Sequence, residues 1–158
     1  MIAVIQRVSK STINIDNITI SEINKGLNVL LCVTADDTKD DVYYLADKIV
    51  KLRIFSDMND KMNLSVLDIN GQIIVISQFT LAADTKKGNR PSFINAADSE
   101  KGEEYYNLFV DYIRSTYKMD IKTGKFAAKM SVEIVNEGPV TIIINSKENR
   151  KKNSYADN

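Results

Sequence analysis

The chain has 158 residues, of which 44% are hydrophobic and 27% charged, so it is long enough for one folded domain and too apolar for a disordered chain. Its 21 basic and 21 acidic residues give a formal net charge of zero, which argues against broad, tight nucleic-acid binding but permits a local basic patch. No apolar run approaches the roughly 20 residues that a membrane span needs, and Gln6 and Arg7 make the N-terminus unlike a signal peptide. We therefore expect a cytoplasmic protein.

Two residue types restrict the chemistry. The chain contains no histidine, which excludes nucleophile systems of the Ser-His-Asp and Cys-His kinds. Its single cysteine, Cys32, cannot form an internal disulfide, and without histidine it cannot complete a usual zinc site. We expect no metal and no cofactor, and proton transfer near pH 7 must use groups other than imidazole.

The first half of the chain predicts three strands and a helix. Residues 2–8 alternate as a strand does, and the alternation over 13–20 is interrupted by Asp16-Asn17, which predicts a hairpin. The apolar run 27–33 predicts a central strand. Thr38 is suited to cap a helix whose apolar stripe is formed by Val42, Leu45, Ala46 and Ile49.

The second half predicts a long strand over 72–81, an exposed loop over 82–95, a second helix, and two more strands over 130–136 and 140–145. Asp98 or Ser99 is expected to cap this helix. Its apolar face is expected to contain Tyr105, Leu108, Phe109, Tyr112, Ile113 and Thr116.

These elements predict an α+β fold, barrel-like, with a mainly antiparallel β-sheet and two packed helices. A doubly wound fold is not expected, because the pattern lacks βαβ alternation. Residues 1–145 are expected to form a single domain, and the polar residues 146–158 a disordered tail.

Three segments are candidates for function. Ser77-Gln78-Phe79-Thr80 places hydroxyl, amide and aromatic groups where a strand leaves the core, although strand ends often use such hydroxyls only to bond the backbone. Gly138-Pro139 lets the backbone approach a ligand closely, or simply forms a turn. Lys86, Lys87 and Arg90 lie in a loop with glycine, proline and Phe93, which suits a phosphate contact or an ordinary solvated surface.

The order of these segments is more specific than any one of them. The chain begins Met-Ile-Ala-Val-Ile-Gln-Arg-Val, continues with Ser-Gln-Phe-Thr at 77–80 and the loop 87–93, and ends its last strands around Asn-Glu-Gly-Pro-Val-Thr at 136–141. In these motifs residues 1–145 resemble the D-aminoacyl-tRNA deacylase family, also known as the D-tyrosyl-tRNA deacylase family.

The resemblance implies a homodimer whose active site lies at the subunit interface and removes the D-amino acid from D-aminoacyl-tRNA, as proofreading in translation. It implies that Gly138-Pro139 is cis and reaches into the partner's pocket, and that its backbone oxygens select the chirality of the substrate. It further implies that Arg7 supports this dipeptide and that Met130 belongs to the pocket. Ser77, Gln78, Phe79 and Thr80 are implied to line the pocket, with Phe79 near the terminal adenosine.

Selection by rejection has a consequence for glycine. Glycine has no side chain to clash, so glycyl-tRNA mischarged on tRNA-Ala should also be a substrate. Hydrolysis of an activated ester needs a positioned water, an oxyanion site and a proton acceptor. We hypothesise that the ribose 2′-hydroxyl activates the water and that the N–H groups of Phe79 and Thr80 hold the oxyanion; in the alternative mechanism Thr80 is the nucleophile.

Two other functions are open at this stage. One is a non-catalytic tRNA-binding dimer, which would bind substrate without turnover. The other is a sister deacylase that acts on a small L-aminoacyl-tRNA and has a trans Gly-Pro bond.

Overall fold

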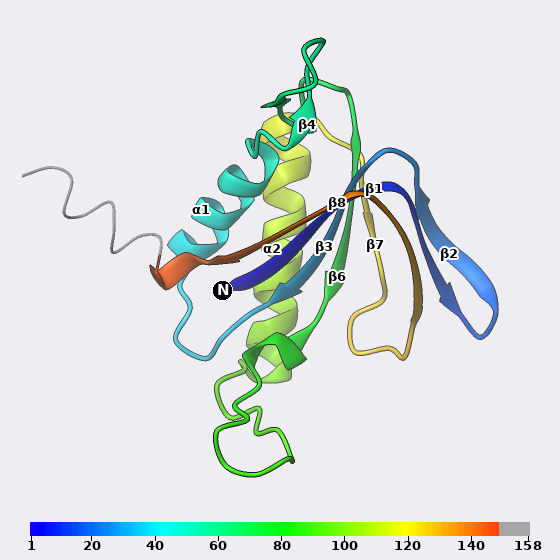
Figure 1. The fold of residues 1–158 in the computed structure, drawn as a ribbon. Helices are drawn as coiled ribbons and strands as arrows, with labels where there is room; N and C mark the ends of the chain where they lie inside the picture. Colours follow the sequence, from blue (N-terminus) through cyan, green and yellow to red (C-terminus); the bar gives the residue numbers. More distant parts are fainter. Residues whose placement is uncertain (149–158) are drawn as a thin grey trace, which may run out of the picture.

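A curved, mixed sheet of six strands forms the centre of the molecule in this computed structural model, which describes residues 1–148 (Figure 1). Its strand order is β2-β1-β3-β6-β7, and β8 pairs with the other edge of β1. The strands are β1 (Ile2–Ile15), β2 (Ile18–Ile23), β3 (Gly26–Cys32), β6 (Gln72–Ser77), β7 (Ile121–Thr123) and β8 (Ser131–Asn145). A separate short hairpin consists of β4 (Phe55–Ser56) and β5 (Met62–Leu64).

Two strands are longer than the sequence predicts. β1 continues from the first predicted strand into the hairpin, where Asp16 and Asn17 form the expected turn with φ of 49° and 63°. β8 is one strand of 15 residues, so the prediction of two strands separated by Gly138-Pro139 is wrong. Both strands remain continuous because they pair with each other along their length, and irregularities in register near Val8 absorb the change of direction.

The sheet is nearly closed and barrel-like with helices packed against it, which confirms the predicted fold class. The expected absence of βαβ alternation is wrong, however. β3 pairs with β6 in parallel, and β6 pairs with β7 in parallel. Parallel neighbours require a crossover connection, and these two crossovers contain the two helices. The irregular segments that flank each helix conceal this alternation in the sequence.

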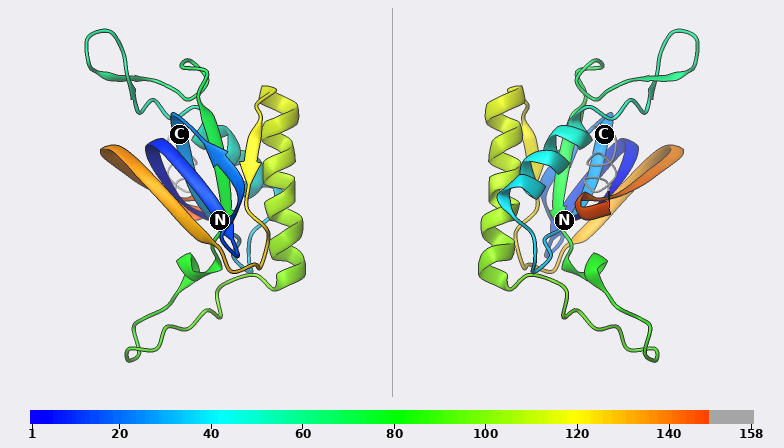
Figure 2. Two further views of the ribbon diagram at one scale, coloured as in Figure 1. Left: turned by 90° about the vertical axis from the view of Figure 1, so that its right-hand side faces the viewer. Right: turned by 90° about the vertical axis from the view of Figure 1, so that its left-hand side faces the viewer.

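The two predicted helices, α1 (Lys39–Val50) and α2 (Ser99–Tyr117), lie on the same side of the sheet (Figure 2). Thr38 and Asp41 form a capping box at the start of α1, and Asp98 caps α2 by accepting a hydrogen bond from the Lys101 N–H at 2.9 Å.

The buried face of α2 differs in part from the prediction. Phe109 and Ile113 are buried as expected, but their neighbours in the core are Tyr106 and Val110. The expected Tyr105, Leu108 and Tyr112 are only partly buried at the margin of the core. The face is rotated because α2 packs against both the sheet and α1.

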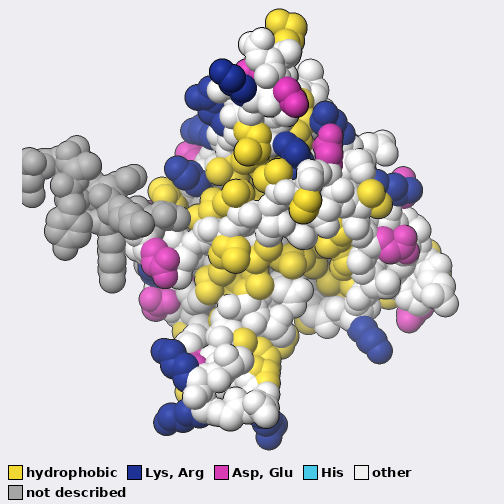
Figure 3. All heavy atoms as spheres, viewed as in Figure 1, with side chains coloured by type: hydrophobic (Ala, Val, Ile, Leu, Met, Phe, Trp, Pro, Cys, Tyr) yellow, Lys and Arg dark blue, Asp and Glu magenta, His cyan; other side chains and the backbone are white. Residues whose placement is uncertain are grey.

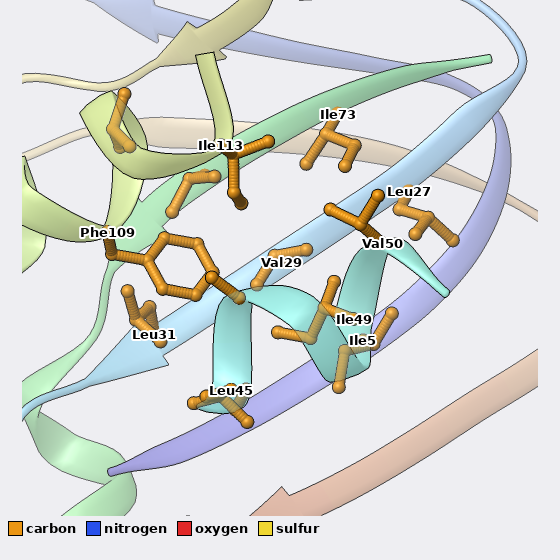
Figure 4. Close-up of a cluster of buried hydrophobic side chains, with 14 of the residues drawn as sticks. Ile5, Leu27, Val29, Leu31, Leu45, Ile49, Val50, Ile73, Phe109 and Ile113 are labelled. Carbon is orange, nitrogen blue, oxygen red and sulfur yellow. The ribbon is translucent and has the colours of Figure 1, made fainter. Parts of the chain in front are cut away.

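The main core lies between the helices and the sheet (Figure 4). Phe109 and Ile113 from α2 meet Leu45 and Ile49 from α1 over a layer of strand residues, among them Val29. Burying one such side chain stabilises the fold by about 1.5–3 kcal/mol, so this layer fixes the positions of both helices on the sheet. A smaller cluster on the other face contains Val8, Ile13, Ile23, Ile74 and Ile76.

The domain extends past the boundary at residue 145. Residues 146–148 are helical, Ser146 is fully buried, and its N–H donates to the Met1 carbonyl at 2.9 Å. Lys147 donates to the Asp41 carboxylate at 3.0 Å. The expectation of a disordered tail is therefore wrong for residues 146–148, and its remainder, 149–158, lies outside the described residues. No helix within residues 1–148 is long and apolar enough to span a membrane.

Candidate active site

The strand β6 ends at Ser77, four residues earlier than predicted, and the chain turns into the short 3₁₀ helix η1 (Phe79–Ala82). The Gln78 N–H still bonds to the Leu31 carbonyl at 2.8 Å, but β3 ends at Cys32 and offers no further ladder. Without a partner strand the backbone groups are satisfied by a tight helical turn instead. The four residues of the Ser-Gln-Phe-Thr motif therefore sit at a strand-to-helix junction.

This junction forms one wall of a pocket, here called the strand-end pocket, with a volume of about 750 Å³. The opposite walls come from the loop before α2, the first residues of α2 and the segment that precedes β8. The lining residues are Ile76, Ser77, Gln78, Phe79, Phe93, Ile94, Ala96, Ala97, Asp98, Ser99, Phe126, Ala127, Ala128, Met130 and Val132. Apolar walls with a few polar groups are typical of sites for small ligands or for the end of a larger one.

Aromatic rings dominate two sides of the strand-end pocket. Phe79 is 55% exposed, and its ring meets that of Phe93 edge to face, with 5.1 Å between centroids. On the other side Phe126 packs against Gly102, where an added Cβ would lie 3.3 Å from the ring. Exposed aromatic faces next to a pocket suit the stacking of a nucleotide base.

The polar groups of the motif are arranged around the junction. The Gln78 side-chain amide donates to the Thr80 hydroxyl at 2.5 Å. Ser77, Gln78, Phe79 and Met130 line the strand-end pocket, whereas Thr80 lies beside it, is exposed, and is not among the lining residues. The sequence predicts five residues for this pocket, the four of the motif and Met130. The structure places all of them except Thr80 in its lining.

Cys32 lies directly behind the junction, with its Sγ 3.5 Å from the Phe79 carbonyl oxygen. Burial raises the pKa of this thiol to about 11. The thiol is therefore protonated at neutral pH and is a poor nucleophile.

The Gly138-Pro139 bond is cis, in line with the resemblance. Both residues are exposed, and Gly138 has a φ of +122°. Arg7 lies against them: its Nε donates to the Glu137 carbonyl at 3.0 Å and its Nη1 to the Ile54 carbonyl at 2.6 Å. A Cβ on Gly138 would lie 2.8 Å from the Arg7 guanidinium, so Arg7 packs closely on this dipeptide as expected.

Within one chain the dipeptide lies away from the strand-end pocket. Arg7 is level with Leu27 and Ile73, at the start of β3 and β6, whereas the first residue of β6 that lines the pocket is Ile76. The three residues of strand from Ile73 to Ile76 correspond to roughly 10 Å. Gly138 and Pro139 therefore do not line the pocket of their own chain.

The loop that carries Lys86, Lys87 and Arg90 projects beyond the body of the molecule (Figure 1), and Phe93 and Ile94, which follow these cations, line the strand-end pocket. Its base is closed by hydrogen bonds of 2.8 and 2.9 Å between the backbones of Asp84 and Ser92. Lys and Arg side chains gather on this projection (Figure 3), and all three predicted cations are exposed. A longer ligand that enters the pocket would pass close to them.

Several pocket residues were not predicted. Phe126, Ala127 and Ala128 come from a short segment between β7 and β8 that carries no recognisable motif, and Ser99 comes from the start of α2. Only the lone aromatic residue at 126, in a segment with two lysines, could have drawn attention to this segment. Among residues 1–148 no cluster of three or more histidine, cysteine, aspartate or glutamate residues could hold a metal ion.

The fold and the pocket define a class of small proteins with a nearly closed mixed sheet, two helices on one face, and an aromatic-walled site where a central strand ends. Residues 4–145 match the family model described as D-Tyr-tRNA(Tyr) deacylase, and the chain belongs to this family. A protein from Persephonella marina named D-aminoacyl-tRNA deacylase is 55% identical over 147 residues, which cover 93% of this chain and 99% of that protein. One of the same name from Natranaerobius thermophilus is 53% identical, with coverage of 92% and 97%.

Solved structures agree with this fold. The c-Myc DNA Unwinding Element Binding Protein superposes with a TM-score of 0.87 at 40% sequence identity, covering 92% of this chain and 98% of its own. A probable eukaryotic D-amino acid tRNA deacylase superposes with a TM-score of 0.80 at 15% identity, covering 90% and 97%, which at this identity shows the fold alone.

Proposed function

We propose that the protein hydrolyses the ester bond of D-aminoacyl-tRNA and releases the free D-amino acid and tRNA. The family is named after this reaction. For this chain, the strand-end pocket is the observation that supports the proposal. Phe79 and Phe93 offer aromatic surface for the terminal adenosine, and the inner, apolar part of the pocket near Met130 and Phe126 is available to the aminoacyl group.

The mechanism uses the backbone and the substrate in place of a side-chain nucleophile. Phe79 and Thr80 open η1, and the first N–H groups of a helix have no acceptor within it. These N–H groups hold the oxyanion that develops when water attacks the ester. The ribose 2′-hydroxyl of the substrate activates this water, since the chain has no imidazole and the Cys32 thiol is protonated.

A substitution at Thr80 distinguishes this mechanism from the alternative, in which the Thr80 hydroxyl is the nucleophile. We expect Thr80→Ala to retain most of the wild-type kcat on D-Tyr-tRNA, because the hydroxyl accepts a bond from Gln78 and does not line the pocket. Single-turnover kinetics on the purified variant measure this. A fall of about a thousandfold or more in a folded variant would favour the nucleophile mechanism.

Chirality is selected by a second copy of the chain. Gly138 and Pro139 are exposed and remote from the pocket of their own chain, so we propose that they enter the pocket of a partner subunit in a homodimer. Their carbonyl groups there occupy the space that the side chain of an L-residue needs. Rejection by a thousandfold requires only about 4 kcal/mol, which one backbone clash supplies.

The surface of a single chain supports the dimer. Hydrophobic side chains gather over β1 and β8 in the centre of the face shown in Figure 3. On β8, Ile143 is 71% exposed and Val135 is 53% exposed. On the neighbouring strand β1, Val4 pairs with Ile143. An apolar patch next to the Gly-Pro dipeptide is the surface expected of a two-fold interface.

Turnover of tRNA substrates tests the whole proposal. We expect release of D-tyrosine from D-Tyr-tRNA, no release of L-tyrosine from L-Tyr-tRNA, and release of glycine from glycyl-tRNA mischarged on tRNA-Ala. A protein that binds D-Tyr-tRNA without turnover would be the non-catalytic dimer, and preferential release of a small L-amino acid would identify the sister deacylase. The site of action that fits this substrate is the cytoplasm, where tRNA is aminoacylated for translation.

A further inference from the structure

A groove at the C-terminal end of α1 has no role in the function proposed above. It has a volume of about 420 Å³ and is lined by Tyr44, Asp47, Lys48, Lys51, Leu52 and Arg53; we call it the cationic groove. Figure 3 shows Lys and Arg side chains gathered along the upper left of the molecule, over this end of α1 and the chain that leads to β4.

The charge of the cationic groove is positive. Its one carboxylate, Asp47, accepts hydrogen bonds from the hydroxyls of Tyr112 at 2.9 Å and Tyr117 at 2.7 Å, and Lys51 lies 3.7 Å away. No ion pair joins Lys48 to an acid within residues 1–148. The carboxylates of Asp57 and Asp68 feel the charge of Arg53 and offset part of it, which leaves Lys48 and Lys51 as the main cations.

The cationic groove lies next to the Gly-Pro dipeptide of its own chain. Arg53 directly precedes Ile54, whose carbonyl accepts a 2.6 Å bond from Arg7. The same guanidinium donates to the Glu137 carbonyl at 3.0 Å, one residue before Gly138. Arg7 thus joins the wall of the groove to the segment that we assign to the partner's pocket.

The strand-end pocket of the same chain is distant from this groove. α2 has 19 residues, and its C-terminal Tyr117 bonds to Asp47 in the groove, whereas its first residue, Ser99, lines the pocket. At about 1.5 Å per residue the helix separates the two sites by roughly 28 Å. A tRNA end held in one pocket is therefore closer to the groove of the subunit that donates the Gly-Pro dipeptide.

We propose that the cationic groove binds the phosphate backbone of a tRNA whose aminoacylated 3′ end occupies the pocket of the partner subunit. The inference rests on the proposed function, because it requires the Gly-Pro dipeptide to enter that pocket. Lysine side chains on a surface neutralise phosphates without reading bases, so the groove contributes affinity and orientation to any tRNA. One subunit then supplies the pocket, and the other supplies both the chiral selector and the backbone clamp.

Charge reversal at Lys48 and Lys51 tests the clamp. We expect the double variant Lys48→Glu/Lys51→Glu to lower kcat/KM on D-Tyr-tRNA by roughly tenfold at low salt and to reduce the slope of log kcat/KM against log salt concentration by roughly two. On D-tyrosyl-adenosine, which has the ester but no phosphate backbone, kcat/KM should equal that of the wild type.

The matched control is Lys10→Glu/Lys122→Glu, which changes the net charge equally at the exposed Lys10 and the half-buried Lys122, paired with Glu22 and Asp120. This control should leave both substrates unaffected. Unchanged kinetics of the groove variant on D-Tyr-tRNA, or an equal loss on both substrates, would overturn the clamp. If instead the wild-type protein hydrolyses neither substrate, the proposed function itself fails, which is a distinct result.

Mixed dimers test which subunit supplies the groove. One chain carries Gly138→Ala and keeps its pocket, and the other carries Phe79→Ala and keeps its Gly-Pro dipeptide, so each dimer retains one complete site. Placing Lys48→Glu/Lys51→Glu on the Phe79→Ala chain should lower activity on D-Tyr-tRNA by roughly tenfold, whereas placing it on the Gly138→Ala chain should have no effect. The reverse pattern would overturn the assignment to the partner subunit.

Discussion

At the scale of single residues, Gly138 is the most constrained position of the candidate site. Its φ of +122° is rarely adopted by residues with a side chain, and the space that a Cβ would need is taken by the Arg7 guanidinium at 2.8 Å. The Arg7 guanidinium is held beside this glycine by its bond to the Glu137 carbonyl. Glycine is required here by the close approach of Arg7 as well as by the backbone.

We predict that Gly138→Ala destabilises the fold by about 1–3 kcal/mol and lowers kcat/KM on D-Tyr-tRNA by roughly a hundredfold, because the methyl group displaces Arg7 and with it the dipeptide. Gly88→Ala is the control: its φ is also positive, at 72°, but nothing lies within 4 Å of the added Cβ. Denaturant unfolding and steady-state kinetics measure both effects. Equal activity of the two variants would show that the Arg7 contact has no catalytic importance.

The sequence predicts which residues belong to the candidate site better than it predicts where each of them lies in the structure. Ser77, Gln78 and Phe79 line the pocket together because they are adjacent in one motif, and Met130 lines it from the segment before β8. Thr80 belongs to the same motif but turns away, since the strand ends at Ser77 and η1 begins. Phe126 reaches the pocket only through its packing on Gly102 and Tyr106, a tertiary contact that local sequence does not encode.

At the scale of elements, the start of α1 is joined to the end of the described chain. Burial of the Asp41 carboxylate opposes its ionisation, but hydrogen bonds from the Thr38 N–H, Lys147, Ser146 and the Thr38 hydroxyl outweigh burial and hold its pKa far below the usual range. A carboxyl with a lowered pKa in the folded state contributes stability that is present above its unfolded pKa, about 3.9, and is lost as the pH falls below it.

We therefore predict that the free energy of unfolding falls as the pH is lowered below about 4, and that Asp41→Asn removes part of this dependence. At pH 7 the substitution should cost about 3 kcal/mol, since it breaks a buried, charged network. Asp111→Asn, at an exposed carboxylate paired with Arg114 within α2, should change stability by no more than about 0.5 kcal/mol. Urea unfolding between pH 3 and 7 provides the comparison, and identical pH profiles for wild type and Asp41→Asn would contradict the assignment.

Helices were predicted more accurately than strand ends. The caps Thr38 and Asp98 bond to residues three positions away, so their geometry depends only on the local sequence. The end of β6 at Ser77 instead follows from the end of its neighbour β3, and the continuity of β8 follows from its pairing with β1. Strand limits depend on partners distant in the sequence, which is why the predicted strands were too long at one site and divided at another.

At the scale of the whole molecule, the proposed shared site needs two segments of the chain that do not meet within one subunit. The strand-end pocket and the Gly-Pro dipeptide lie at opposite ends of β6, and exposed apolar residues of β8 lie near the dipeptide. We predict that Ile143→Lys, at a side chain that is 71% exposed, yields a folded monomer that has lost at least about 99% of its activity on D-Tyr-tRNA.

Sedimentation measures the oligomeric state of this variant, and its thermal unfolding should show that the fold is intact. Ile18→Lys is the matched control, because this side chain is 67% exposed beside the turn of the β1–β2 hairpin, and the substitution should leave the assembly and the activity unchanged. A fully active Ile143→Lys monomer would refute the shared site.

The sequence by itself determined the chemical limits and the family of this protein. Without histidine and with one cysteine it excludes the common nucleophile systems, and its ordered motifs are properties of residue type and spacing that need no coordinates. Only the tertiary structure decided that β3, β6 and β7 run parallel, that the pocket includes Phe126 and the start of α2, and that Arg7 holds the Gly-Pro dipeptide remote from it. These features depend on contacts between segments far apart in the chain, whose free energy is set by packing and pairing in the folded state and not by local preference.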